Sequence, residues 1–160
     1  MTTLYIREGN EFREATAKVV LDRANALIAQ RFRPGTPVMT VPDRTREFLV
    51  LKLGALEHEV FAALFLDSRN RLIEYVELFR GTISAASVHP REVVKEALAR
   101  NAASLILCHC HPSGVPTPSD ADELITQRLK EALALVDIRV LDHIIVAGNQ
   151  AASFVAMGLL

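Results

Sequence analysis

The first third of the chain carries its hydrophobic residues at helical spacing. Residues 10–32 predict a helix with one buried face, because apolar side chains recur there every three to four positions, and the Arg-Pro-Gly sequence at 33–35 ends it. A second helix is predicted to start at Pro42 and to end near Gly54. The residues expected on the buried face of the first helix are Phe12, Ala15, Val19, Val20, Ala24, Leu27 and Ile28.

The pattern then becomes strand-like. Residues 60–66 form a short, wholly apolar run, and residues 71–79 alternate between apolar and polar side chains. The segment between them, Asp-Ser-Arg-Asn at 67–70, has the composition of a turn. Together these three segments predict a β-hairpin.

Helices and strands alternate in the second half of the chain. Pro90 suits the first turn of a helix that Asn101 ends, and an apolar strand is predicted directly afterwards at 104–111. Ser119 resembles the N-cap of a further helix, which is predicted to run to about Val136. This alternation of element types is typical of a sheet covered by helices.

Two more strands, at 138–148 and 152–158, complete the predicted set. Alternating strands and helices with one early hairpin indicate an α/β fold, in which helices flank a mixed sheet. The leucines expected to face inward from the helix after Ser119 are Leu124, Leu129, Leu133 and Leu135.

Composition and charge narrow the class of protein. A chain of 160 residues, 50% hydrophobic and 23% charged, has the size and balance of one folded globular domain. Its formal net charge of -1 gives the molecule as a whole no attraction to nucleic acid. Nucleic acid could then be bound only through a local basic patch. The chain begins without a basic segment followed by an apolar core, and no apolar run approaches the roughly 20 residues that cross a bilayer. We therefore expect a cytoplasmic protein without a membrane partner.

The densest candidate chemistry lies in CHCHPSGVPTPSDAD, residues 108–122. On a strand, His109 and His111 point to the same face with attachment points roughly 6 to 7 Å apart, so both imidazoles can reach one ion. The following loop contains three prolines and one glycine, and it returns Ser119 and Asp122 towards the strand end. Asp122 could complete a His-His-Asp metal site, or it could form only a capping box with Ser119. Spacing alone leaves both interpretations open.

Several other metal-dependent classes do not fit these residues. Zinc deaminases need His-x-Glu and a later Pro-Cys-x-x-Cys, which the chain lacks. The second histidine is followed by Pro-Ser, unlike the His-x-His-x-Asp-His of metallo-β-lactamase-like hydrolases. Amidohydrolase barrels typically need about 250 residues, more than this chain has.

The order His109-Cys110-His111-Pro112, then Ser119 and Asp122, resembles the His-x-His-Pro…Ser-x-x-Asp signature of JAB/JAMM (MPN+) metallopeptidase domains. The longer string HPSGVPTPSDAD resembles the RadC-like branch of that family. Segments 64–73, 78–98 and 135–148 continue the resemblance, so that it covers roughly residues 45–160.

The resemblance implies a JAB1/MPN-type fold with cytidine-deaminase-like architecture over residues 41–160. Residues 1–40 resemble the N-terminal extension of short, prophage-type RadC-like proteins, which lack the helix-hairpin-helix segment of longer members. We expect that extension to be helical and to pack on the domain.

The resemblance also assigns roles to residues. It makes His109, His111 and Asp122 the ligands of a Zn²⁺ ion, and it makes Glu59 the base that takes a proton from the water that the metal activates. Ser119 would donate a hydrogen bond to the oxyanion, unless its hydroxyl serves only as a helix cap. Glu59 could instead be a solvated residue at a strand start, and Glu57 competes for the role of base. The histidines expected to be structural or on the surface are His58, His89 and His143.

Cys110 is one departure from the RadC-like pattern, which usually has asparagine between the two histidines. Strand alternation points its side chain away from the proposed ion, so ligation should survive, and a small buried apolar role is expected. Cys108 and Cys110 share a strand face, where a bond between them would be strained, so no disulfide is expected.

The function expected from this resemblance is that of a zinc-dependent hydrolase cleaving a peptide or isopeptide amide bond in a protein or peptide substrate. The alternative is a DNA-repair or mobile-element accessory protein with a non-catalytic or vestigial metal site. Clustering of basic residues on one face would favour nucleic acid, and the residues concerned are Arg91, Lys95, Arg100, Arg128 and Lys130.

Overall fold

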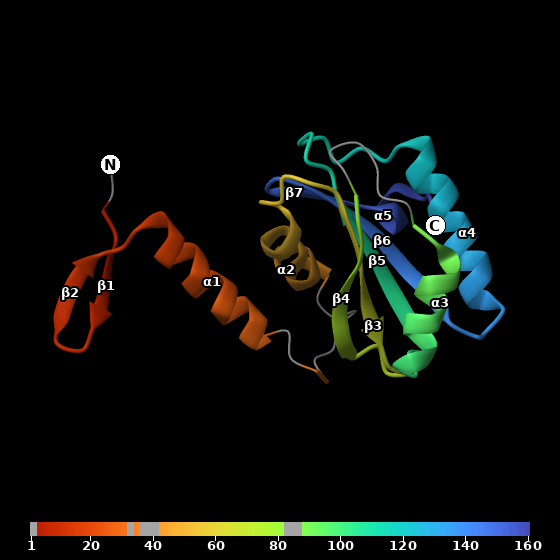
Figure 1. The fold of residues 1–160 in the computed structure, drawn as a ribbon, viewed down its shortest axis with the longest axis horizontal. Helices are drawn as coiled ribbons and strands as arrows, with labels where there is room; N and C mark the ends of the chain where they lie inside the picture. Colours follow the sequence, from red (N-terminus) through yellow and green to blue (C-terminus); the bar gives the residue numbers. More distant parts are fainter. Residues whose placement is uncertain (1–2, 32–33, 36–41, 82–87) are drawn as a thin grey trace. The chain divides into compact units, whose positions relative to one another are not determined.

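The structure is a computed structural model that describes residues 3–31, 34–35, 42–81 and 88–160 (Figure 1). The chain forms two compact units, Met1–Phe32 and Arg33–Leu160. The described helices are too short or too polar for any of them to cross a membrane.

The first unit is a β-hairpin followed by a helix, and it corrects the prediction of a helix from residue 10. Strands β1 (Tyr5–Glu8) and β2 (Glu11–Glu14) pair antiparallel, and α1 (Ala17–Arg31) begins only after Thr16, whose hydroxyl accepts a hydrogen bond from the Val19 N–H. The two-residue loop Gly9-Asn10 makes the hairpin possible, because Gly9 adopts a positive φ of 63°. Residue 32, the predicted end of the helix, lies outside the described residues.

Where the structure describes their side chains, the residues of the apolar face predicted for the first helix are exposed or half-buried. Phe12 belongs to β2 and is 71% exposed, and Leu27 of α1 is 51% exposed. A hairpin and one helix are too small to enclose a core, and among the described residues no buried hydrophobic side chain precedes Phe48. That this extension packs on the domain therefore stays a prediction.

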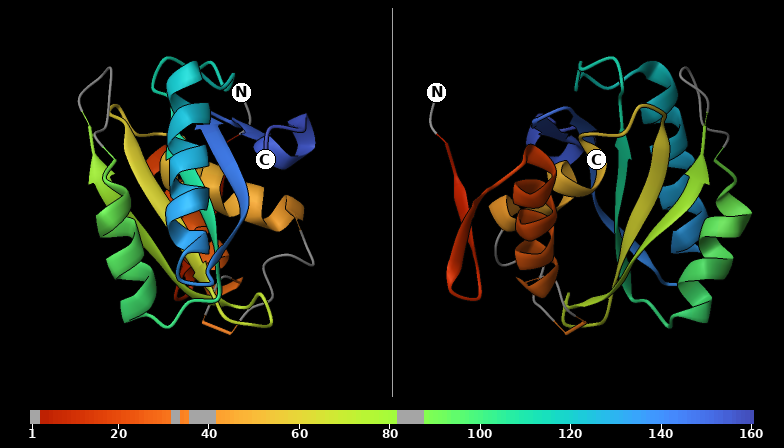
Figure 2. Two further views of the ribbon diagram at one scale, coloured as in Figure 1. Left: turned by 90° about the vertical axis from the view of Figure 1, so that its right-hand side faces the viewer. Right: turned by 60° about the vertical axis from the view of Figure 1, so that its left-hand side comes forward.

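The second unit is a five-stranded sheet with helices on both faces (Figures 1 and 2). Its order is β4-β3-β5-β6-β7, with β5 and β6 parallel and the other neighbours antiparallel. This confirms the predicted mixed α/β class. In chain order the elements are α2 (Pro42–Leu53), β3 (Val60–Leu66), β4 (Leu72–Arg80), α3 (Pro90–Ala99), β5 (Ser104–Cys110), α4 (Asp120–Ala134), β6 (Arg139–Ala147), β7 (Gln150–Ser153) and α5 (Phe154–Met157).

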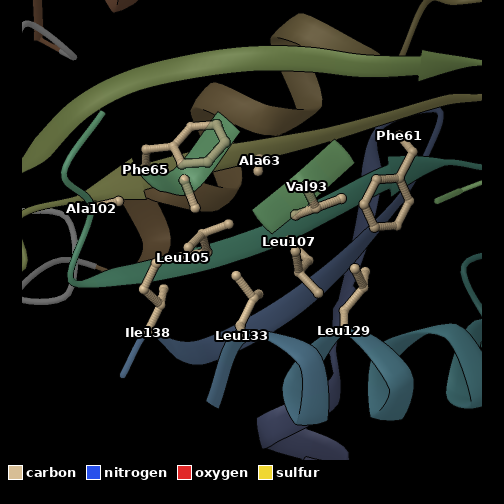
Figure 3. Close-up of a cluster of buried hydrophobic side chains, with 11 residues drawn as sticks. Phe61, Ala63, Phe65, Val93, Ala102, Leu105, Leu107, Leu129, Leu133 and Ile138 are labelled. Atoms are coloured by element: carbon tan, nitrogen blue, oxygen red, sulfur yellow. The ribbon is translucent and has the colours of Figure 1, made fainter. Parts of the chain in front are cut away.

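The main core lies between one face of the sheet and helices α3 and α4, while α2 covers the opposite face (Figures 2 and 3). Alternation along β3 and β5 sends every second side chain into this core. Because both faces of these strands are covered, β3 and β5 are buried along their whole length. The buried core residues are Phe61, Ala63, Phe65, Val93, Ala97, Ala102, Leu105, Leu107, Leu129, Leu133 and Ile138.

Two local predictions for this unit are wrong. Leu124 and Leu135 do not face inward from α4 but are 63% and 86% exposed, because they lie more than 100° around the helix from the buried Leu129. The predicted strand at 152–158 ends at Ser153, whose hydroxyl caps the short helix α5 through the Ala156 N–H. The remaining helices and strands predicted for this unit are confirmed to within one or two residues.

Candidate metal centre

His109 and His111 lie at the end of the central strand β5, on the face that carries α4. His109 pairs in register with Phe61 on β3 and with Ile145 on β6, so the strand end is held from both sides. His111 follows directly, and its backbone N–H donates to the Val146 carbonyl at 2.8 Å, which continues the alignment. The predicted same-face arrangement is confirmed, with ring centroids 4.7 Å apart.

The loop after β5 turns sharply and brings α4 back beside the strand end. Gly114 has a φ of +80° and donates its N–H to the His111 carbonyl, which closes a tight turn. Helix α4 then begins with a complete capping box: the Ser119 hydroxyl accepts from the Asp122 N–H, and the Asp122 carboxylate accepts from the Ser119 N–H at 2.8 Å. The cap fixes where Asp122 lies.

These elements bring the side chains of His109, His111 and Asp122 together. The two Nε2 atoms lie 2.9 Å apart. The Asp122 carboxylate places Oδ1 3.1 Å from His109 Nε2 and Oδ2 3.4 Å from His111 Nε2. One ligand atom from each residue lies within 4.8 Å of the others, so the three could hold one metal ion. The two interpretations of Asp122 from the sequence are therefore compatible, because its carboxylate caps α4 and also faces the two histidines.

Hydrogen bonds at the far side of each ring turn Nε2 toward Asp122, where it can donate to the carboxylate or, once deprotonated, bind a metal ion. His111 Nδ1 lies 2.9 Å from the Val115 carbonyl, which can only accept, so Nδ1 carries a proton and Nε2 is the nitrogen that faces Asp122. His109 Nδ1 lies 2.8 Å from His143 Nε2. Bonds of this kind orient metal-binding imidazoles in proteins.

His143 is the residue that sequence reasoning missed. It was predicted to be a satisfied core histidine, and it is indeed fully buried on β6, but its ring contacts His109 directly. Its Nδ1 also lies 2.5 Å from the Thr126 hydroxyl on α4. Burial lowers the pKa of His143 well below its ordinary value, so its ring is neutral. The available signal was a histidine directly before the apolar run at residues 144–147 of β6.

Charge stabilisation within the site shifts two pKa values in opposite directions. Burial opposes ionisation of Asp122, but hydrogen bonds from His109 and His111 outweigh it and hold the pKa of the carboxyl group well below its usual range. The hydrogen bond to Asp122 raises the pKa of His111 above its ordinary value, against the effect of burial. The carboxylate is therefore ionised at neutral pH.

Glu59 lies directly before β3 and lines the same cleft as the three clustered residues. The cleft has a volume of about 490 Å³. Glu57, its competitor for the role of base, is exposed and is not among the described residues that line the cleft. The wall also includes an apolar set, Val60, Phe61, Val88, Leu124 and Ile125, together with Ser113, Ser119, Ala121 and Arg128.

Ser119 caps α4 in this structure, and its hydroxyl also donates to Asp122 Oδ2 at 2.6 Å. The alternative role at an oxyanion stays a prediction. Two of the remaining histidines lie apart from the clustered residues: His89 is exposed at the start of α3 without capping it, and His58 is half-buried before Glu59.

Cys110 points to the opposite face of β5, as predicted, and is buried. Its sulfur accepts a hydrogen bond from the Val60 N–H and donates one to the His58 carbonyl, so it is more than an apolar filler. Cys108 lies on the same face, and both thiols are free.

Comparison with known proteins identifies the family. A UPF0758 protein of Nitrosococcus oceani is 64% identical over 123 residues, 77% of this chain and 55% of that protein. One of Methylibium petroleiphilum is 54% identical over 148 residues, 92% of this chain and 66% of that protein. One of Vibrio cholerae is 56% identical over 141 residues, 88% of each. The chain spans less than two thirds of the length of the first two relatives.

The family description that matches is that of the RadC-like JAB domain, over residues 39–159. The match includes the whole strand-loop-helix segment that carries His109, His111 and Asp122. The sequence resemblance to this family is thus confirmed, and the chain belongs to the RadC-like JAB domain family.

Proposed function

We propose that this protein is a zinc-dependent hydrolase that cleaves an amide bond, in a peptide or an isopeptide linkage. The observation that supports this most is the convergence of His109, His111 and Asp122 beside Glu59 in one cleft. Two imidazoles and a carboxylate are a ligand set of catalytic zinc sites, which keep a fourth position open.

The spacing of the three ligand atoms fits that ion. Tetrahedral zinc with bonds of about 2.0–2.1 Å separates its ligand atoms by roughly 3.3 Å. The distances between Nε2 of His109, Nε2 of His111 and the carboxylate oxygens of Asp122 are 2.9, 3.1 and 3.4 Å. His109, His111 and Asp122 would hold the ion with small movements of their side chains.

Glu59 is the proton carrier in this proposal. When bound, zinc acidifies a water molecule and polarises the carbonyl group that is attacked. The Glu59 carboxylate accepts the proton from the attacking water and later delivers it to the leaving amine. Its half-buried position in the wall of the cleft suits this exchange, because the group remains within reach of substrate.

Ser119 stabilises the charge that develops on the carbonyl oxygen. Its hydroxyl lies in the wall of the cleft and donates to Asp122 Oδ2. Serving the oxyanion requires the hydroxyl to rotate away from that carboxylate oxygen, while the Ser119 N–H keeps Asp122 in place. A single donor of this type is worth about 10²- to 10³-fold in turnover.

The cleft is suited to an extended protein or peptide segment. Apolar side chains dominate its wall beyond the clustered residues, with Leu124 of α4 63% exposed. Arg128 lies on the same side of α4 and lines the cleft as well. A peptide with an apolar side chain near the scissile bond and an acidic group further along matches these surfaces.

The test is turnover of peptide and isopeptide substrates by the wild type and by two matched glutamate variants. Glu59→Gln should lower turnover by about 10²- to 10⁴-fold, because it removes the proton acceptor and leaves the size of the side chain unchanged. Glu57→Gln is the control and should behave as the wild type, because Glu57 does not line the cleft among the described residues. Undiminished turnover in Glu59→Gln removes Glu59 from this role.

The alternative, a DNA-transaction role, predicts a free basic surface. Arg91 and Lys95 share Glu92, and Arg100 pairs with Glu74 and Glu96, so three of these five basic residues have an acidic partner nearby. The alternative would be favoured if the protein cleaved none of the peptide and isopeptide substrates and bound DNA with an affinity that falls steeply as the salt concentration rises.

A further inference from the structure

A chain of hydrogen bonds runs behind the candidate metal centre, through side chains to which the proposed mechanism gives no part. It begins at the main-chain carbonyl of Asp122, which accepts from the Thr126 hydroxyl at 2.5 Å. Thr126 Oγ1 lies 2.5 Å from His143 Nδ1, and His143 Nε2 lies 2.8 Å from His109 Nδ1. Thr126 and His143 are both buried.

The direction of each bond follows from the number of protons available. A threonine hydroxyl has one proton, and Thr126 gives it to the Asp122 carbonyl, so Thr126 accepts from His143 Nδ1. If His109 binds a metal ion through Nε2, its one ring proton lies on Nδ1, so His109 Nδ1 donates to His143 Nε2. His109 Nε2 faces Asp122 and His111, where it can bind the ion.

We propose that Thr126 and His143 form a buried relay that positions His109 as a metal ligand through its Nε2 atom. The relay fixes both the orientation of the ring and the nitrogen that carries the proton. Because it starts at the backbone of Asp122, it also couples the His109 ligand on β5 to the Asp122 ligand on α4. This inference rests on the metal site of the proposed function and adds two positioning residues to it.

Packing keeps the relay rigid. The His143 ring stacks on Phe154 with centroids 4.7 Å apart and meets Phe61 edge-on at 5.6 Å. Water cannot replace its partners, because the side chain is fully buried. A buried imidazole with only one satisfied nitrogen would lose the free energy of a hydrogen bond, so the Thr126 hydroxyl is needed to hold the Nδ1–H form.

Two substitutions at Thr126 distinguish a relay from a contact that only fills the core. Thr126→Val keeps the shape of the side chain and removes the hydroxyl, and Thr126→Ser keeps the hydroxyl and removes a methyl group. If Thr126 and His143 only fill the core, the two variants should bind metal alike. If they form the relay, only Thr126→Val should weaken metal binding.

The experiment measures zinc affinity by competition with a chromophoric chelator for the wild type, Thr126→Val, Thr126→Ser and His143→Leu. We expect the affinity to fall about 10- to 100-fold in Thr126→Val and in His143→Leu, as is typical when an outer partner of a ligating histidine is lost. Thr126→Ser should match the wild type within error. The Thr126 pair decides the question even if His143→Leu does not fold.

A spectroscopic readout on the zinc-loaded wild type tests the proton positions without any assay of turnover. Long-range ¹H–¹⁵N correlation of labelled histidine should show the His143 proton on Nδ1. A proton on Nε2 of His143, or equal zinc affinity in Thr126→Val and Thr126→Ser, overturns the relay and leaves the proposed function standing. If the wild type binds no zinc, both the relay and the proposed function fail.

Discussion

The sulfur of Cys110 lies 3.3 Å from the backbone nitrogen of Val60 and accepts its hydrogen bond, across 50 residues of sequence. The same thiol donates to the His58 carbonyl at 3.4 Å. It therefore holds both peptide groups that flank Glu59. One face of the end of β5 carries His109 and His111. On the other face, Cys110 binds the backbone on either side of Glu59, the proposed base.

Replacing Cys110 should consequently affect Glu59 and not the metal. We expect Cys110→Val to lower turnover about two- to tenfold at unchanged zinc content, because the hydrogen bonds that it removes are worth about 0.5–1.5 kcal/mol each. Cys110→Ser, which can donate and accept, should retain more activity. Wild-type turnover in Cys110→Val would mean that the thiol does not position Glu59.

Both thiols should resist chemical modification in the folded protein. Burial raises the pKa of Cys108 and of Cys110, and both side chains are buried. A thiol-specific reagent should label neither cysteine at neutral pH within the time needed to label both in denaturant. Rapid labelling of either thiol under native conditions would contradict this burial.

Three substitutions at Ser119 separate its capping from its proposed catalytic role. Ser119→Ala should destabilise the protein by about 1 kcal/mol, whereas Ser119→Gly should cost only a few tenths, because glycine is tolerated at an N-cap. Both lack the hydroxyl and should lose turnover equally, and Ser119→Thr should keep it. Thermal unfolding and turnover measured together distinguish the roles. If turnover follows stability across the three variants, the hydroxyl serves only the cap.

The turn between β3 and β4 should make stability depend on pH. Hydrogen bonds from the Arg71 backbone and side chain lower the pKa of Asp67, with a further bond from the Arg69 N–H. A lowered folded-state pKa contributes stability above the unfolded-state pKa of about 3.9, and this contribution is lost as the pH falls through the folded-state value. The stability advantage of the wild type over Asp67→Asn in urea should therefore shrink below about pH 4. An advantage that is constant down to pH 2 would contradict it.

The sequence predicted the clustered residues because their geometry is local. Strand alternation places His109 and His111 on one face, and a short stiff loop with a capped helix returns Asp122 within 13 residues of His109. The His143 contact could not be predicted in this way. It depends on the parallel register of β5 with β6, which pairs Leu107 with His143 and which no local pattern encodes.

The errors at the two ends of the chain have a different cause. The apolar spacing around Phe12 suits either a helix or a strand, and the Gly9-Asn10 turn decides for the strand. Near the C-terminal end, Ser153 converts an apolar stretch from strand to helix through one capping bond. Such short elements are decided by single turns and caps, which average hydrophobic periodicity does not detect.

The central claim is that His109, His111 and Asp122 jointly hold one zinc ion. Its most direct test is the zinc content of purified wild type, His109→Ala, Asp122→Ala and, as a control outside the cluster, His89→Ala. We predict about one equivalent in the wild type and in His89→Ala, and loss of zinc in the other two, because each removes one of three protein ligands. Equal zinc content in all four proteins would contradict the account.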